Sequence, residues 1–181
     1  MARAAKALGG ALPALVLMTD DARLDDPLAA ARALPKGSMI VARARHGLEP
    51  LARALLEARR CTVLIAGDPV LAARLGAHGI HLPEARAGEA AYWRARFPHM
   101  LITASAHSLR ALARDHVDAF FLSPVFETQS HPGRASLGAV RADLIARQAR
   151  VPVYALGGID ARNAARLSGF GGIAAIGALV A

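Results

Sequence analysis

The sequence predicts a single α/β domain with a closed (β/α)8 barrel, the TIM-barrel fold. Eight short apolar runs recur along its 181 residues, and each is rich in Val, Ile and Leu without alternating polar residues. Such runs are typical of parallel strands that are buried on both faces. Helix-like stretches separate the runs, and eight strand–helix units favour closure of the sheet into a barrel.

The main alternative is an open, doubly wound parallel sheet. That fold would place a glycine-rich turn directly after the first strand. Here the turn is "TDDARLDD", residues 19–26, which carries acidic residues and no glycine. The sequence therefore favours the barrel.

Predicted strands and helices alternate along the chain. The strands are expected within 14–20, 38–44, 61–67, 78–84, 100–106, 118–126, 151–158 and 171–180. The helices are expected within 27–35, 48–59, 69–76, 88–97, 108–116, 138–149 and 160–168. In these stretches Arg and apolar positions repeat with a period near 3.6 residues. Asp160 is placed to cap the last helix, and Pro98 and Pro152 lie where a helix must end before a strand.

The predicted eighth strand ends next to Ala181, so this is expected to be a short version of the barrel with the last outer helix reduced or missing. The barrel domain is expected over residues 12–181. Residues 1–11 are expected to be an N-terminal segment outside the barrel, and the sequence leaves open whether they are ordered.

Composition argues against nucleic-acid and membrane partners. The net charge is +8, but the basic residues are nearly all Arg scattered singly among alanines, and only 4% of residues are aromatic. This pattern is typical of solvated helix faces rather than of a nucleic-acid-binding surface. No run of eighteen apolar residues indicates a membrane span. The single Cys61 excludes an internal disulfide and favours a reducing, cytoplasmic location, and a homodimer is left open.

The active site of such a barrel lies at the carboxyl ends of the strands. Gly157 and Gly158 follow the seventh strand, and Ile176 and Gly177 end the eighth. Glycines in these two loops let backbone N–H groups close on a phosphate, so we expect a phosphate site there. The simpler alternative is that the two adjacent glycines only form a tight turn.

The end of the fifth strand carries Ser105 and His107, in "TASAHS". A histidine beside a hydroxyl at the rim can transfer protons near neutral pH, so His107 is the candidate catalytic residue. Glu84 is a weaker candidate partner. His81, at the end of the fourth strand, is expected to pack below the rim. No His, Cys and Asp spacing predicts a metal site.

Several motifs occur together in a fixed order. They are "LVLMTD", "GAHGIHLPE", "SAHSL", "SPVFETQSHPG", "LG" at 137–138, and "VYALGGID" followed by "GIAAIGAL". Over about residues 12–180 this combination resembles the thiamine-phosphate synthase/TenI superfamily, whose members are (β/α)8 barrels of thiamine biosynthesis. The resemblance implies that the glycine loops hold a thiazole phosphate.

The resemblance also implies ligand-binding roles for the loops after the second and sixth strands. Synthases carry Arg-Glu-Lys at the second strand, where this chain has Arg43, Ala44 and Arg45. The loop after the sixth strand contributes hydroxyls, and its lysine is replaced here by histidine. The corresponding positions are Thr128, Ser130 and His131.

Two activities are known in the superfamily. The synthase joins a pyrimidine diphosphate to the thiazole phosphate, uses Mg²⁺ and releases pyrophosphate. The TenI-type tautomerase moves a proton to aromatise a thiazole phosphate carboxylate and is expected to need no cofactor. For the synthase, the Mg²⁺-binding Asp after the third strand falls near Gly67, with Asp68 one residue later, and Arg86 lies near the place of a second acid.

Because most of the Mg²⁺-binding carboxylates are replaced, the sequence slightly favours a thiazole tautomerase with His107 as general base or acid. The first alternative is a Mg²⁺-dependent synthase that uses Asp68, helped if Asp20 and Asp21 gather beside it. The second is a catalytically silent paralogue that binds thiazole or thiamine phosphates. The expected partner in each case is a small phosphorylated thiazole, joined in the synthase by the pyrimidine diphosphate.

Overall fold

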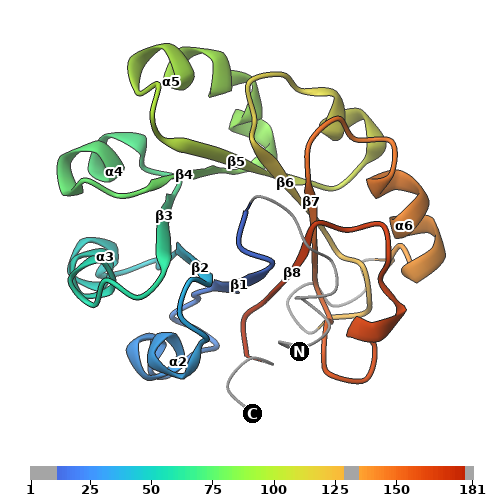
Figure 1. Cartoon of the computed structure of the whole chain (residues 1–181), viewed down its shortest axis with the longest axis horizontal. Helices are drawn as coiled ribbons and strands as arrows, with labels where there is room; N and C mark the ends of the chain where they lie inside the picture. Colours follow the sequence, from blue (N-terminus) through green and yellow to red (C-terminus); the bar gives the residue numbers. More distant parts are fainter. Residues whose placement is uncertain (1–11, 129–134, 178–181) are drawn as a thin grey trace.

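The computed structural model describes residues 12–128 and 135–177. Its eight parallel strands form a closed barrel in sequence order, and pairing of the first strand with the eighth closes the ring (Figure 1). The predicted (β/α)8 barrel is confirmed. The strands are β1 (Leu15–Met18), β2 (Met39–Ala42), β3 (Thr62–Ala66), β4 (Gly79–Leu82), β5 (Leu101–Ala106), β6 (Ala119–Leu122), β7 (Val153–Leu156) and β8 (Gly172–Ala175).

The helices surround the ring of strands (Figure 1). The α-helices are α2 (Pro27–Ala33), α3 (Leu48–Glu57), α4 (Pro69–Leu75), α5 (Ala90–Arg96) and α6 (Ala139–Ala146). Three 3₁₀ segments accompany them, η1 (Glu84–Glu89), η2 (Leu109–Ala113) and η3 (Ala164–Arg166).

Two of the predicted helices are wrong: 108–116 contains the 3₁₀ segment η2, and 160–168 contains η3. In the second stretch the carboxylate of Asp160 accepts two backbone N–H groups of the following turn, at 2.8 and 2.9 Å. The side-chain amide of Asn163 donates to the backbone oxygen of Gly158 at 2.7 Å. Local side-chain-to-backbone hydrogen bonds of this kind offer the chain a turn in place of a helix.

The core has two layers because successive side chains of a strand point to opposite faces. One layer packs between the strands and the helices. The other fills the barrel interior with Val16, Met18, Met39, Val41, Leu64, Ala119, Phe121, Tyr154 and Ala174. The Tyr154 hydroxyl donates to the backbone oxygen of Pro13 at 2.8 Å. The interior is therefore a packed core, as expected for this fold. A ligand site is accordingly expected at the rim of the barrel.

Other expectations concern parts of the chain around this core. Cys61 is buried. Among the described residues no helix is long and apolar enough to cross a membrane. The predicted N-terminal segment 1–11 and the predicted reduction of the last outer helix lie outside the described residues.

Candidate functional site

Arg43 follows β2 at the barrel mouth and is held by two residues that follow β1. The hydroxyl of the buried Thr19 donates to the backbone oxygen of Arg43 at 2.7 Å and accepts from its backbone N–H at 2.7 Å. The Asp20 carboxylate lies 3.4 Å from the Arg43 guanidinium, whose side chain is 49% exposed. A cation is thus fixed at the rim with about half of its surface available to an anionic ligand.

Arg45 is placed differently. Its backbone N–H and that of His46 donate to the Asp21 carboxylate, at 2.9 and 3.1 Å. Its side chain is exposed and makes no hydrogen bond or ion pair with a described residue. Asp20 and Asp21 are therefore each occupied by groups of the loop after β2, and the described residues contain no cluster of these acids with Asp68 that could hold a metal ion.

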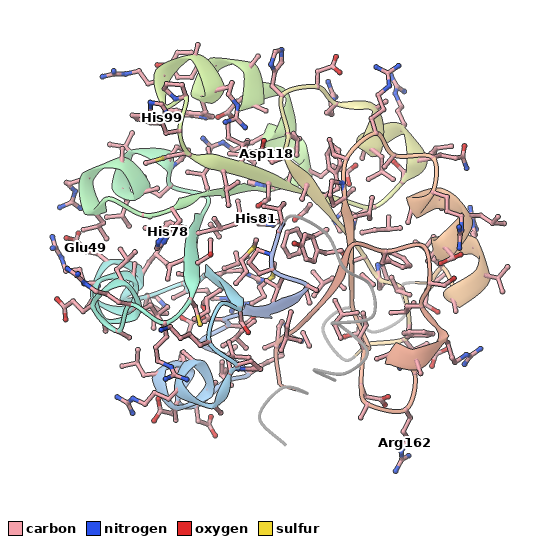
Figure 2. All side chains as sticks on the ribbon, in the orientation of Figure 1. Glu49, His78, His81, His99, Asp118 and Arg162 are labelled. Atoms are coloured by element: carbon pink, nitrogen blue, oxygen red, sulfur yellow. The ribbon has the colours of Figure 1, made fainter. Side chains whose placement is uncertain are left out.

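A polar column runs up the inside of β4 and β5 towards the mouth. Figure 2 shows His81 inside the ring of strands, and its exposure is 4%. Its Nδ1 lies 2.9 Å from the hydroxyl of the fully buried Thr103, and its Nε2 lies 3.0 Å from the hydroxyl of Ser105. Ser105 is partly exposed and is the uppermost member of the column. The prediction that His81 packs below the rim is confirmed.

The surroundings of His81 keep its ring neutral. Burial and, to a smaller extent, the positive charge of Arg43 together lower the pKa of His81 from 6.5 to about 4. The edge of the ring meets Phe121, with centroids 4.9 Å apart, and Phe121 stacks on Tyr154 at 4.9 Å. An apolar wall without an acidic partner cannot stabilise an imidazolium, so the neutral form is the one present near pH 7.

His107 follows β5 and is tied to β6 and to the loop after β4. Its Nδ1 lies 2.8 Å from the backbone oxygen of Ser123, and its backbone N–H donates to the Glu84 carboxylate at 2.6 Å. A carbonyl oxygen accepts only, so Nδ1 carries a hydrogen, and the neutral form of the ring has its lone pair on Nε2. Nε2 has no hydrogen-bond partner among the described residues, so it is able to accept a proton at the rim.

The two glycines after β7 are required by the loop after β6. Gly157 and Gly158 have φ of +94° and +64°. A Cβ at Gly157 would lie 2.9 Å from the Cα of Pro124, and a Cβ at Gly158 would overlap the backbone oxygen of Glu127. The tight-turn explanation therefore accounts for both glycines without a ligand.

The same loop still offers donors for an anion. The backbone N–H groups of Gly157 and Gly158 make no hydrogen bond to any described residue. The helix expected to follow them is replaced by a turn and η3, so its dipole adds little. Ile176 is half-buried and Gly177 is exposed with open space beside it, at the end of β8. A phosphate here would rest on individual N–H groups.

The loop after β6 is described only in part. Thr128 lies within the described residues, whereas Ser130 and His131 lie outside them. Their expected contacts with a phosphate or diphosphate stay predictions.

Asp68 is the carboxylate expected to hold Mg²⁺ in the synthase alternative, and it is the N-cap of α4. Its Oδ1 accepts the backbone N–H of Leu71 at 2.8 Å, which caps the helix and leaves Oδ2 for another partner. Arg86 donates to the backbone oxygen of Gly67 at 2.8 Å and is paired with Glu89 at 2.7 Å. No group of three candidate ligands is present in the described part of the chain. One carboxylate fits Mg²⁺ only when phosphate oxygens of a ligand complete the coordination.

The fold and the site define a class: a (β/α)8 barrel whose mouth combines cations, a histidine and backbone donors that have no partner among the described residues. Residues 50–179 match the family model described as thiamine monophosphate synthase, TMP-TENI. The chain belongs to this family, as its motifs predicted.

Curated relatives carry related names. A protein of Aquifex aeolicus named "Putative thiamine-phosphate synthase 2" is 34% identical over 59% of this chain. A "Thiamine-phosphate synthase" of Thermus thermophilus is 37% identical over 61% of this chain. The matches span 59% and 56% of the length of these two relatives.

Solved structures support the fold. A thiamine phosphate pyrophosphorylase from Pyrococcus furiosus superposes with a TM-score of 0.71 at 22% identity, covering 90% of this chain and 84% of that chain. An aldolase/citrate lyase family protein from Burkholderia cenocepacia superposes with a TM-score of 0.60 at 17% identity, covering 97% and 92%. Barrels of different chemistry are thus similar in shape, so the fold alone does not specify a reaction.

Sequence reasoning missed Thr103 and undervalued its link to His81 and Ser105. A signal was present: "ITASA" carries two polar residues two positions apart in an otherwise apolar strand. Side chains at such positions point to the same face of a strand. That these two side chains meet His81 follows from the register of β4 and β5, in which His81 lies beside Thr103. This register is known only from the structure.

Proposed function

We propose that this chain is an enzyme that binds a phosphorylated thiazole at the barrel mouth and joins it to a pyrimidine diphosphate, the thiamine-phosphate synthase reaction. The observation that carries this proposal is that curated relatives 34% and 37% identical bear this name. It reverses the slight preference for a tautomerase that the sequence motifs alone suggested.

In this proposal the thiazole phosphate lies against the N–H groups of Gly157 and Gly158, with Ile176 and Gly177 beside it. Individual N–H groups hold phosphate oxygens by charge-assisted hydrogen bonds. This assignment is supported by the absence of partners for the first two N–H groups among the described residues.

The more anionic diphosphate would be attracted by the guanidinium groups at the end of β2. Arg43 is fixed through Asp20 and Thr19, whereas the exposed Arg45 side chain is free to adapt to a ligand. Thr128, Ser130 and His131 would close on the ligand from the loop after β6.

In the reaction one bond to the pyrimidine substrate breaks and one new bond forms at the same carbon. The bond between the pyrimidine methylene carbon and the diphosphate oxygen breaks, and its electron pair stays on the diphosphate. The thiazole supplies the pair for the new bond to the same carbon, so no proton has to be removed. The chain's own contribution is to bring the two substrates together and to stabilise the charge of the leaving diphosphate.

Mg²⁺ would be held by the free Oδ2 of Asp68 together with diphosphate oxygens. When bound, it would neutralise part of the charge on the departing diphosphate. Localisation in the cytoplasm and the absence of nucleic-acid and membrane partners remain parts of this proposal.

A thiazole tautomerase is the second candidate, and the geometry of His107 favours it. A neutral imidazole with Nδ1 tied to Ser123 and Nε2 free is suited to remove a proton from a carbon acid. In that reaction the base would hold the proton on Nε2 and return it to another position of the same ligand, without a metal.

One set of assays separates the candidates. The purified chain is incubated with thiazole phosphate and pyrimidine diphosphate, with and without Mg²⁺, and thiamine phosphate and pyrophosphate are measured. Deuterium exchange into a thiazole phosphate carboxylate is followed in parallel. Equal amounts of thiamine phosphate and pyrophosphate support the synthase. Exchange without them supports the tautomerase, and neither product indicates a silent binding paralogue and overturns the enzyme proposal.

A further inference from the structure

A cavity of about 240 Å³ lies on the outer side of the barrel, between α2 and α3. These two helices lie side by side outside the strands (Figure 1). The buried part of the cavity wall is apolar and consists of Ala31 of α2, Ile40 of β2, Leu55 of α3 and Cys61. Cys61 directly precedes β3, at the amino end of that strand, whereas the mouth lies at the carboxyl ends. The cavity is therefore separate from the site at the mouth.

The size and the wall of the cavity define the body of a ligand that fits. An apolar cavity of roughly 150 Å³ stays dry and holds one benzene molecule. The larger volume here has room for two fused rings. The thiol of Cys61 makes no hydrogen bond with a described residue, and burial raises its pKa despite the nearby charge of Arg60. It is thus a neutral, polarisable sulfur, which packs well against an aromatic ring.

Cations outnumber acids where the cavity meets solvent. The exposed residues Arg32, Glu57 and Arg60 line this part. The guanidinium of Arg60 donates to the backbone oxygen of Leu34 at 3.3 Å, which holds it at the end of α2. The side chains of Arg32 and Glu57 make no ion pair with a described residue. Two guanidinium groups against one carboxylate leave one positive charge uncompensated, so the complementary ligand is a monoanion.

We propose that this cavity binds a small aromatic carboxylate, with a two-ring body against Cys61 and the carboxylate between Arg32 and Arg60. A carboxylate makes charge-assisted hydrogen bonds with guanidinium groups. A flat, rigid body loses little conformational entropy when it enters the cavity. The proposal goes beyond the proposed function and does not depend on it, because this ligand takes no part in the reaction at the mouth.

The first experiment measures binding with 2-naphthoate as the probe, without any substrate. Calorimetric titration should give one site with a Kd of about 1 mM or tighter. The neutral analogue 2-naphthylmethanol, which has the same rings, should bind at least about fivefold more weakly. Absence of naphthoate binding, or equal affinity for the two probes, overturns the proposal.

Cys61 is the only cysteine of the chain, so its alkylation reports on the cavity without a substitution. The rate of modification by iodoacetamide is followed by mass spectrometry. At a naphthoate concentration ten times the Kd, we expect the rate to fall roughly tenfold, because the ligand protects the folded state in which the thiol is covered. An unchanged rate overturns the proposal.

Two variants separate this cavity from the mouth. Ala54 lines the cavity from α3, so Ala54→Phe should fill it and weaken naphthoate binding at least about tenfold, with its fold checked by circular dichroism. Arg43→Gln changes the mouth and should leave the affinity within about twofold. The opposite pattern overturns the proposal, and if Ala54→Phe does not fold, Arg43→Gln and the alkylation of Cys61 decide. A dimer that Ala54→Phe dissociates, seen by sedimentation, would assign the cavity to a contact between two copies of the chain and also overturn it.

The charges at the opening provide a test of sign. Arg32→Gln should weaken naphthoate binding at least about threefold, whereas Glu57→Gln should strengthen it by about twofold. Arg53→Gln is the matched control, since Arg53 is also exposed on α3 but pairs with Glu49 and does not line the cavity. Its affinity should equal that of wild type. Weakening by Glu57→Gln, or equal effects of Arg32→Gln and Arg53→Gln, overturns the assignment of the carboxylate.

Discussion

His107 Nδ1 lies 2.8 Å from the backbone oxygen of Ser123, and this contact determines which ring nitrogen is able to accept a proton. Because Nδ1 must donate, Nε2 is the basic atom. The backbone of His107 is held as well, because its N–H donates to the carboxylate of Glu84, which follows β4. A histidine that is fixed through both its ring and its backbone has the geometry of a general base. Its substitution therefore tests whether the reaction needs a base.

His107→Ala should reduce deuterium exchange into a thiazole phosphate carboxylate by roughly a hundredfold or more if the chain has tautomerase activity. Thiamine phosphate formation should fall much less, because that reaction removes no proton. Both rates are measured on wild type and variant, with thiazole phosphate binding as the reference. Full exchange by the variant would exclude His107 as the base and point to Glu84.

Glu84→Gln is the matched control for this variant. The amide oxygen of glutamine still accepts from the His107 backbone N–H, so the position of β5 should be kept. Exchange within a few-fold of wild type is the expected result, and a loss as large as in His107→Ala would assign the proton transfer to Glu84 instead.

The glycine loops allow packing to be separated from ligand binding. Gly158→Ala places a Cβ against the backbone of Glu127 at a φ of +64°. We expect a loss of roughly 2 kcal/mol or more, and a drop in Tm of about 4 °C or more, whether or not a ligand is present. Thermal unfolding followed by circular dichroism checks this, and an unchanged Tm would contradict the packing of the two loops.

Gly177 provides the contrasting variant. A Cβ there meets no atom of the described residues within 4 Å, so Gly177→Val should leave the Tm nearly unchanged. If the loop after β8 holds the phosphate, this variant should weaken thiazole phosphate binding about tenfold in a calorimetric titration, by blocking the approach to the N–H groups. Unchanged affinity would remove Gly177 from the predicted phosphate site.

Stability should depend on pH through His81. Its pKa is about 4 in the folded chain and 6.5 as the ordinary value, so between these values the unfolded state binds the extra proton. The free energy of unfolding should therefore be highest above pH 6.5 and fall as the pH decreases, by up to about 3 kcal/mol at pH 4. Urea denaturation across this range measures the slope. His81→Phe should flatten it, and an equal slope in that variant would assign the effect to other groups.

The sequence predicts the strands but not the hydrogen-bond and ion-pair partners that neighbouring strands bring to each residue. The apolar runs predicted all eight strands because a parallel strand buried on both faces has a local signature. In the synthase alternative Asp20 and Asp21 could have gathered beside Asp68, but their partners belong to the loop after β2 and follow from the pairing of two strands. The helix at 160–168 was lost to hydrogen bonds of Asp160 and Asn163, whose competition with a helix depends on their exact geometry.

Asp68 permits a test of the metal that leaves the fold intact. Its Oδ1 caps α4 through the N–H of Leu71, and Asn caps a helix about as well as Asp. Asp68→Asn should therefore keep the free energy of unfolding within about 0.5 kcal/mol, whereas Asp68→Ala should lose about 1 kcal/mol with the cap.

The two substitutions remove the same negative charge, so they should affect Mg²⁺ equally despite their different stabilities. If Asp68 holds the ion, both variants should need at least about tenfold more Mg²⁺ for half-maximal thiamine phosphate formation, because the amide and the methyl group are poor ligands for this hard cation. The titration is run for wild type and both variants at saturating substrates. An unchanged Mg²⁺ requirement in Asp68→Asn would show that the diphosphate binds its ion without Asp68. Turnover without any added divalent ion, in wild type treated with a chelator, would show that the guanidinium groups at the rim suffice for the leaving diphosphate.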